Sequence, residues 1–459
     1  MRPLSIVTPL LLASVIFAQE ESKHPYDAAR AAMKSRVAEQ RKQFAGNPDV
    51  RFFGDVMADR KGRRVEIQAC ATGARLTDPI EFFVTPFNSG KDYEAICATE
   101  AVPSDVHKAL EFIGLVPGRP VNFNTNHHWP RGPRVVMTFG VGDADIRAED
   151  MLVDPQTSKP LARTGLVFAG SYTRTDPSGV KRYAADEADS RTIASNYNDP
   201  AAVLDIPVRA PQSAIYGSRR PNPEHAPKLG ELIRISLAPA PLADAVVDVD
   251  VMVTATPAGY RLEERGKPPT EVRNLVHLLD TLAGRLDGKS NLFTRVTIDT
   301  EVKIDQLRKL YAVLMSVEQD RGVKLEPPAE GELFHRSFFP EEEWRSRENR
   351  LGEPWEFFLQ RTGEQLSGRL ERQVDRGEAG EQKRVVERYE VKSPAELVRL
   401  VNDNQSQWSK TVFVYPPADM SYGELRAWTT PVLATYPRVF VFPVMSPTTR
   451  PATQPATTP

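Results

Sequence analysis

The strongest constraint on the fold is an order of strand and helix patterns that occurs twice in the second half of the chain. Within residues 244–327 and again within 385–445, three short apolar strand patterns alternate with two helix patterns. Strand–helix alternation is typical of a sheet covered by helices. We therefore expect two small α/β units of the βαβαβ type.

Local start signals mark the helices of these units. Thr270 is expected to cap the first helix of the first unit. In the second unit, Ser393 with Glu396 and Ser421 with Glu424 have the spacing of capping boxes.

Residues 46–240 have a different pattern, in which short strand patterns are broken by glycine and proline. One helix pattern follows Pro103, with Ser104 as its expected cap and Gly114 at its end. These features predict a β-rich α+β domain, so the whole chain is expected to be an α+β multidomain protein.

The remaining segments are polar. Residues 19–45 predict a solvated leader helix or a disordered arm, and residues 330–384, which carry many charges of both signs, predict a charged helical spacer. The tail at 446–459 is rich in threonine and proline and is expected to be disordered.

The N-terminus has the features of a secretory signal peptide over residues 1–18. Arg2 precedes an uncharged stretch from Leu4 to Phe17, and a small residue follows. The stretch is shorter than a membrane span, and no other window is long and apolar enough to cross a bilayer. We expect a protein located outside the cytoplasm, in the periplasm or secreted.

Charge and cysteine content exclude several classes of partner and cofactor. Lysine plus arginine is 59 and aspartate plus glutamate is 61, so electrostatics gives no general reason to bind nucleic acid. Two cysteines are too few for a four-cysteine zinc or iron–sulfur site, and we expect no cofactor. In an oxidising compartment, Cys70 and Cys97 form either a disulfide or two buried thiols.

The candidate polar site of the first domain comprises Glu94, His107 and Asp186. His107 can act as an acid or base beside Glu94, or bond a backbone carbonyl near its helix start. His127 and His128 are candidate metal ligands, but adjacent side chains in a strand point to opposite faces. The alternative for this pair is loop packing.

Residues 46–240 resemble the YdjY-domain family of secreted bacterial proteins. The segments that carry the resemblance are Gly90–Glu94, Pro103–Leu110, Gly114–Gly118, Val167–Ser171, Tyr183–Asp186 and Leu204–Pro207. Tyr93 stands where many relatives carry histidine. The resemblance implies no particular activity.

The two α/β units resemble the extracytoplasmic domain of TolR/ExbD-type proteins, through Val296–Asp299 in the first copy and Val412–Tyr415 in the second. That resemblance implies a domain that pairs with another copy and contacts envelope components. The family also has a membrane-spanning helix with a functional acid, for which this chain has no counterpart.

Together these features predict a non-enzymatic interaction or scaffold protein with envelope or secreted protein partners. Two alternatives stay open, a metal-dependent or hydrolytic enzyme with its site in residues 46–240 and a protein that binds a small ligand or glycan. The oligomeric state is not predicted.

Overall fold

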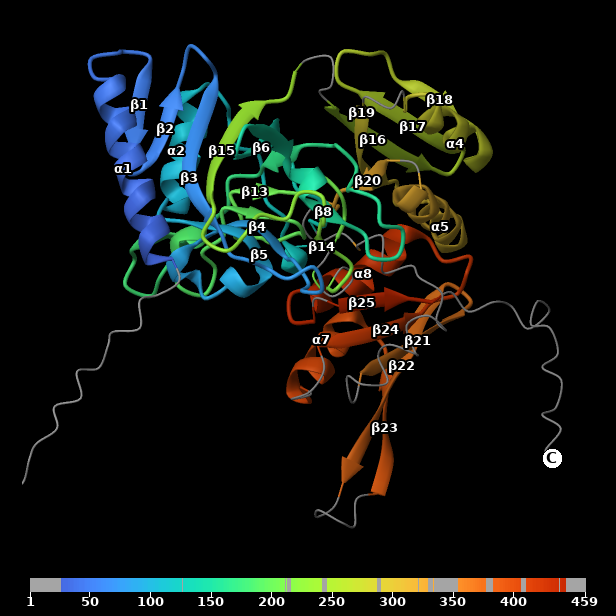
Figure 1. Ribbon diagram of the computed structural model, residues 1–459. Helices are drawn as coiled ribbons and strands as arrows, with labels where there is room; N and C mark the ends of the chain where they lie inside the picture. The colour runs from blue at the N-terminus through green and yellow to red at the C-terminus, as the bar shows by residue number, and fades with distance from the viewer. Residues whose placement is uncertain are drawn as a thin grey trace, which may run out of the picture.

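The computed structural model describes residues 26–125, 127–210, 212, 216–241, 246–286, 290–320, 322–328, 333, 354–376, 383–405, 410–436 and 438–442. It is a mixed α/β protein with a β-rich N-terminal region and two smaller α/β sheets (Figure 1). The expected signal peptide and C-terminal tail lie outside the described residues. No helix in the described ranges is long and apolar enough to cross a membrane.

Eight strands of the N-terminal region close into a barrel in the order β3-β15-β6-β9-β13-β12-β4-β5, because β5 also pairs with β3. β1 and β2 extend the sheet beyond β3, and β7 pairs with β6. Apolar side chains from alternate strand positions fill the interior, among them Ile67, Phe83 and Phe139. The strands are β1 Val50–Phe53, β2 Val56–Asp59, β3 Arg64–Ala71, β4 Phe82–Pro86, β5 Ala95–Thr99, β6 Arg134–Val141, β7 Ala144–Arg147, β9 Leu166–Phe168, β12 Ala194–Ser195, β13 Leu204–Asp205 and β15 Leu232–Pro239.

This region also contains two short antiparallel strand pairs and several 3₁₀ turns. β8 (Leu152–Val153) pairs with β14 (Arg220–Pro221), and β10 (Thr173–Thr175) pairs with β11 (Lys181–Tyr183). The turn η2 (Asp92–Glu94) leads into β5.

Two helices pack on the barrel region. α1 (Asp27–Gln43) buries Ala29, Met33 and Val37, so the predicted leader helix is present, but it is docked and neither solvated nor disordered in this part. The apolar stripe is thin, but the sheet provides the surface that covers it.

α2 (Pro103–Phe112) begins two residues earlier than expected, because Val102 is its N-cap and Pro103 occupies the first turn. The predicted cap, Ser104, therefore lies inside the helix. Gly114 has φ +91° just beyond the helix end, as the sequence indicated.

The two α/β sheets have the same strand order. The first is β18-β17-β16-β19-β20 and the second is β23-β22-β21-β24-β25, each with two parallel and two antiparallel strand pairs. The first contains β16 Val247–Thr256, β17 Gly259–Glu264, β18 Thr270–Val272, α4 Leu275–Ala283, β19 Ser290–Ile298, α5 Ile304–Asp320 and β20 Val323–Leu325. The second contains β21 Trp355–Thr362, β22 Gln365–Arg376, β23 Lys383–Val391, α7 Pro394–Asp403, β24 Thr411–Tyr415, α8 Tyr422–Leu433 and β25 Arg438–Val441.

Each unit thus has two more strands than expected. Thr270 starts β18 and does not cap a helix; the side chain of Asn274 caps α4 by accepting from the His277 amide at 2.9 Å. The predicted caps of the second unit are present, since Ser393 accepts from the Glu396 amide and Ser421 forms a capping box with Glu424.

The predicted helical spacer was wrong over residues 355–376, which form β21 and β22. Trp355, Phe357 and Leu359 are buried and alternate with more exposed residues, so the local period is that of a strand. The second unit therefore includes Trp355 and does not begin at residue 385. Residues 334–353 of the spacer lie outside the described residues.

The two units share one hydrophobic core that includes Leu307, Leu310, Leu397 and Trp428. The main chain before α5 also pairs with the main chain before α8. The Tyr422 amide donates to the Val302 carbonyl at 2.8 Å, and the Ile304 amide donates to the Met420 carbonyl at 3.0 Å.

Lys303 and Ser421, each the residue immediately before its helix, form a β-bridge with each other. Equivalent positions of the two units thus contact each other, as in the isologous interface of a dimer.

Candidate functional site

Asp186 lies at the start of α2 and not in a catalytic cluster. It belongs to the turn η5 (Ala184–Asp186), and its Oδ1 accepts a hydrogen bond from the Ser104 amide at 2.9 Å. A carboxylate at this position satisfies a free amide of the first helical turn and complements the helix dipole. This contact is the capping interaction that the sequence assigned to Ser104.

His107 lies on α2 in a compact cluster of hydrogen-bonded polar groups. Its Nδ1 is 2.9 Å from the Tyr183 hydroxyl and 3.1 Å from the Gly170 carbonyl, while the Tyr183 hydroxyl donates to that carbonyl at 2.7 Å. Glu111 lies 3.6 Å from Nε2, one turn further along the helix. The contact with a backbone carbonyl is the structural role that the sequence offered as an alternative for His107.

The same cluster contains a serine with a strained backbone. Ser171 has φ +56° and a buried hydroxyl that faces Tyr183 without forming a hydrogen bond of normal geometry. Burial raises the pKa of Tyr183 far above its usual value, so this phenol stays protonated. The arrangement orients Tyr183 as a donor to Gly170 and does not provide a base directed at Ser171.

Glu94 belongs to a separate acidic cluster at another part of the barrel. Its main-chain carbonyl accepts from the Glu81 amide at 2.9 Å, and Gln212 donates to the Glu81 carboxylate at 2.7 Å. Burial, followed by the charge of Glu81, raises the pKa of Glu94, and burial likewise raises the pKa of Glu81 and of the fully enclosed Asp205. The structure therefore does not bring Glu94 together with His107 and Asp186 through any contact it shows.

His127 and His128 lie in the loop after the turn η3 (Phe123–Thr125). His127 Nδ1 is 2.8 Å from the Thr125 hydroxyl, and the ring of His128 lies 5.8 Å from that of Phe123. Within the described part of the chain, no three His, Cys, Asp or Glu side chains lie together in a way that could hold a metal ion.

Cys70 and Cys97 are both buried free thiols. On the paired strands β3 and β5, Cys70 lies opposite Ala98 while Ala71 lies opposite Cys97. Because neighbouring residues of a strand point to opposite faces, the two thiols lie on opposite sides of the sheet. The disulfide alternative is therefore not what the structure shows.

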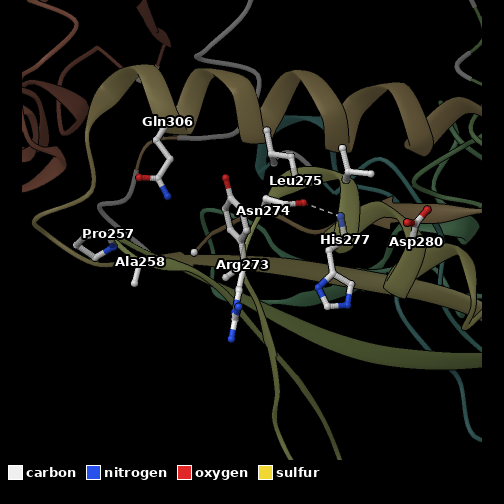
Figure 2. Close-up of a pocket in the computed structure, with 11 residues that line it drawn as sticks. Pro257, Ala258, Arg273, Asn274, Leu275, His277, Asp280 and Gln306 are labelled. Carbon is white, nitrogen blue, oxygen red and sulfur yellow. Dashed lines mark hydrogen bonds between the residues drawn. The ribbon is translucent and has the colours of Figure 1, made fainter.

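A pocket of about 660 Å³ opens beside the N-terminus of α4 and the turn between β16 and β17 (Figure 2). Arg273, His277, Asp280 and Gln306 contribute polar groups. The His277 amide is already capped by Asn274, and Gln306 donates to the Thr256 carbonyl. The pocket thus has a mainly apolar lining with a few polar groups, and these do not form a convergent set of buried, unsatisfied groups.

The sequence did not predict the interface between the barrel and the first α/β unit. Arg119 of the barrel region pairs with Glu326 at 2.7 Å, and Arg131 pairs with Asp250 at 2.8 Å. Glu326 is buried, and both pairs join residues more than one hundred positions apart in the chain.

Lys324 lies at the centre of this interface, on β20. Its ammonium group donates to the Pro207 carbonyl at 3.1 Å and lies 4.9 Å from the ring of Trp129 and 5.2 Å from that of Phe293. Trp129 Nε1 donates to Glu318 on α5 at 3.3 Å. In the sequence, the signal for this interface was a lysine that lies between two apolar residues of a buried strand.

The sequence model of the YdjY domain matches residues 56–235. This range spans the barrel from β2 into β15. No curated protein and no solved structure matches the chain.

Proposed function

Because residues 56–235 are a YdjY domain, we propose that this protein is a non-enzymatic scaffold outside the cytoplasm, in the periplasm or secreted. In this proposal the YdjY domain and two TolR/ExbD-like α/β units form one preassembled body that presents a docking edge to other envelope proteins. The N-terminal signal directs the chain to that compartment.

The pairing of the two α/β units is the observation that carries the proposal. The TolR/ExbD resemblance implies a domain that pairs with a second copy, and here both copies belong to one chain. They share a core, and their equivalent segments before α5 and α8 are hydrogen-bonded to each other. A tandem pair of this kind needs no second chain to cover its pairing surface.

The docking edge is β23. It is the outer strand of its sheet, and among the described residues it pairs with β22 alone. The β22–β23 hairpin extends away from the rest of the molecule (Figure 1). The side chains of Val385 and Val386 on this strand are 41% and 45% exposed, which suits addition of an extended segment from a partner.

The geometry gives less support to a hydrolytic enzyme. Asp186 is bonded to the start of α2, and His107 is bonded to Tyr183 and Gly170. Glu94 lies in a different cluster. Each of these residues thus has a structural partner.

Site-specific photo-crosslinking in cells tests the scaffold proposal. A benzoylphenylalanine at Val386 is compared with one at Val180, a similarly exposed valine in the β10–β11 turn. We expect discrete adducts with envelope or secreted proteins from Val386 and none from Val180. Absence of adducts from Val386, together with a hydrolytic activity that His107→Ala abolishes, would contradict the proposal.

A further inference from the structure

Helix α4 of the first α/β unit carries more apolar surface than the core covers. Its inner side buries Leu278 and Leu282 in the core that the two units share. The apolar surface then continues around the helix through Leu279 and Ala283, which are half-buried, to Val276, which is 69% exposed. A surface helix normally carries polar residues on the side away from the core, so this extended apolar side needs a separate explanation.

The equivalent helix α7 of the second unit shows that the fold does not require this apolar side. The N-caps Asn274 and Ser393 mark the same position in the two helices, so Ala283 of α4 corresponds to Asn402 of α7. Asn402 is exposed. The same architecture thus has a polar residue at this position in one unit and an apolar one in the other.

A cavity of about 370 Å³ lies between α4 and the C-terminal half of α5. Two of the residues that line it, Leu282 of α4 and Val323 of β20, are only 1% exposed, so the cavity reaches down between the helices to the sheet. Ligand pockets commonly have volumes of about 300–1,000 Å³ and mainly apolar walls. The apolar residues of the lining are Leu279, Leu282, Ala283, Leu286, Val317 and Val323.

The volume of the cavity favours a slim apolar ligand over a helix from a partner protein. One turn of an α-helix, about 5.4 Å long and 10–12 Å wide, occupies roughly 400–600 Å³, which is more than the cavity offers. An alkyl chain is narrower and has no polar groups along its length, so it can enter without burying an unsatisfied donor or acceptor. Water, in contrast, needs two to four polar partners in a cavity.

The mouth of the cavity sets the preference for a headgroup. Among the described residues that line the cavity, the polar ones are Asp280 and Ser316, and both are exposed. The carboxylate of Asp280 disfavours an anionic headgroup and attracts a cationic one, by a small amount because solvent screens an exposed charge.

We propose that the cavity between α4 and α5 binds the alkyl chain of a single-chain amphiphile, with the headgroup in water beside Asp280. The chain packs against Leu279 and Ala283 on one side and against Val317 on the other. The site belongs to the first α/β unit and the docking edge β23 to the second, so either proposal can fail without the other.

Isothermal titration of the full mature chain with hexyl-, octyl- and decyltrimethylammonium, each below its micelle concentration, tests the site. We expect saturable binding with an affinity that rises about fourfold for each added methylene, the effect of burying one CH₂ group. Decanoate, with an anionic headgroup, should bind more weakly than decyltrimethylammonium. Asp280→Asn should reduce the difference between these two ligands.

A variant that fills the cavity tests its location. Ala283→Phe should weaken the binding of decyltrimethylammonium by at least about tenfold, because the new ring occupies the space of the chain. The matched control is Asn402→Phe, at the equivalent exposed position of α7, which should leave the affinity unchanged. If Ala283→Phe does not fold, Val317→Asn places a polar amide in the wall and should weaken binding for a different reason.

Three results would overturn the proposal. Absence of saturable binding to the parent would mean that the cavity does not admit an alkyl chain. An affinity that does not depend on chain length would mean that the charge of the headgroup alone drives binding. Unchanged affinity in a folded Ala283→Phe or Val317→Asn variant, or an equal loss in Asn402→Phe, would place the bound chain elsewhere on the protein.

Discussion

At the scale of single residues, strand register determines whether the two cysteines can form a disulfide. Cys70 and Cys97 are close in the sheet but point to opposite faces. Burial raises the pKa of Cys70 to about 11 and that of Cys97 well above its usual value, which suppresses the reactive thiolate.

We therefore expect the native protein to retain two thiols that resist iodoacetamide at pH 8. Both should react fully once the protein is denatured without reductant, as mass spectrometry can count. A protein that is lighter by two hydrogens and remains unlabelled after denaturation would show a disulfide.

The buried acids give the protein a defined pH dependence. A carboxyl whose folded-state pKa is raised stabilises the fold below its unfolded-state pKa, and this contribution is lost as pH rises through the folded value. Glu94 is such a group. Glu94→Gln, which mimics the protonated form, should therefore raise the urea midpoint at pH 7 and lose this advantage toward pH 4.

The matched control is Glu39→Gln, at an exposed position of α1. Its midpoint should follow the parent's across the pH range. An advantage of Glu94→Gln that is constant with pH would contradict the assignment to ionisation.

The sequence identified His107 and Asp186 as notable but could not show what they contact. Asp186 meets Ser104, which is 82 positions away, and His107 meets Tyr183 and Gly170 across the fold. Local spacing carries no information on such tertiary contacts. The pairing of Lys324 with Trp129 was missed for the same reason.

At the scale of elements, the start of α2 depends on Asp186. Asp186→Ala removes the acceptor for the Ser104 amide and should lower the free energy of unfolding by about 1 kcal/mol, the usual effect of losing a helix cap. Urea denaturation measures the change. Asp186→Asn, which keeps an acceptor oxygen, should lose less; equal losses would rule out capping as the cause.

At the junction between α5 and α8, close packing predicts the opposite effect on stability from helix propensity for the substitution Gly423→Ala. Gly423 lies in the first turn of α8, where alanine normally favours a helix by up to about 1 kcal/mol. A Cβ there would lie 2.9 Å from Thr300 Cβ, so Gly423→Ala should instead destabilise by about 1–3 kcal/mol.

Thr300→Gly removes the contacting Cβ and should reduce the cost of Gly423→Ala in a double-mutant cycle of unfolding free energies. If Gly423→Ala stabilises the protein, the two segments are not packed as closely as the structure shows.

Elements with local signals were predicted well, and elements that depend on their partners were not. The capping box of Ser421 and Glu424 lies within four residues and is present. The sequence predicts a charged helix where β21 and β22 lie, because their outward positions carry the charges, whereas Trp355 and Phe357 face the core that the rest of the sheet provides.

At the scale of the whole molecule, the barrel sheet and the two five-stranded α/β sheets contact one another. The α/β units share a core, and the YdjY domain meets the first unit through Arg119–Glu326, Arg131–Asp250 and the contacts of Lys324. If these contacts make the YdjY domain and the paired α/β units unfold together, weakening the interface should make them unfold separately.

Differential scanning calorimetry of the mature chain, with and without Trp129→Ala, is the most direct test of this central claim. Trp129 is buried and contacts Lys324 and Glu318, so its removal weakens the interface without touching either core. We predict one cooperative transition for the parent and two for the variant, with the YdjY domain and the paired α/β units melting separately. Two transitions in the parent that Trp129→Ala leaves unchanged would contradict a preassembled scaffold.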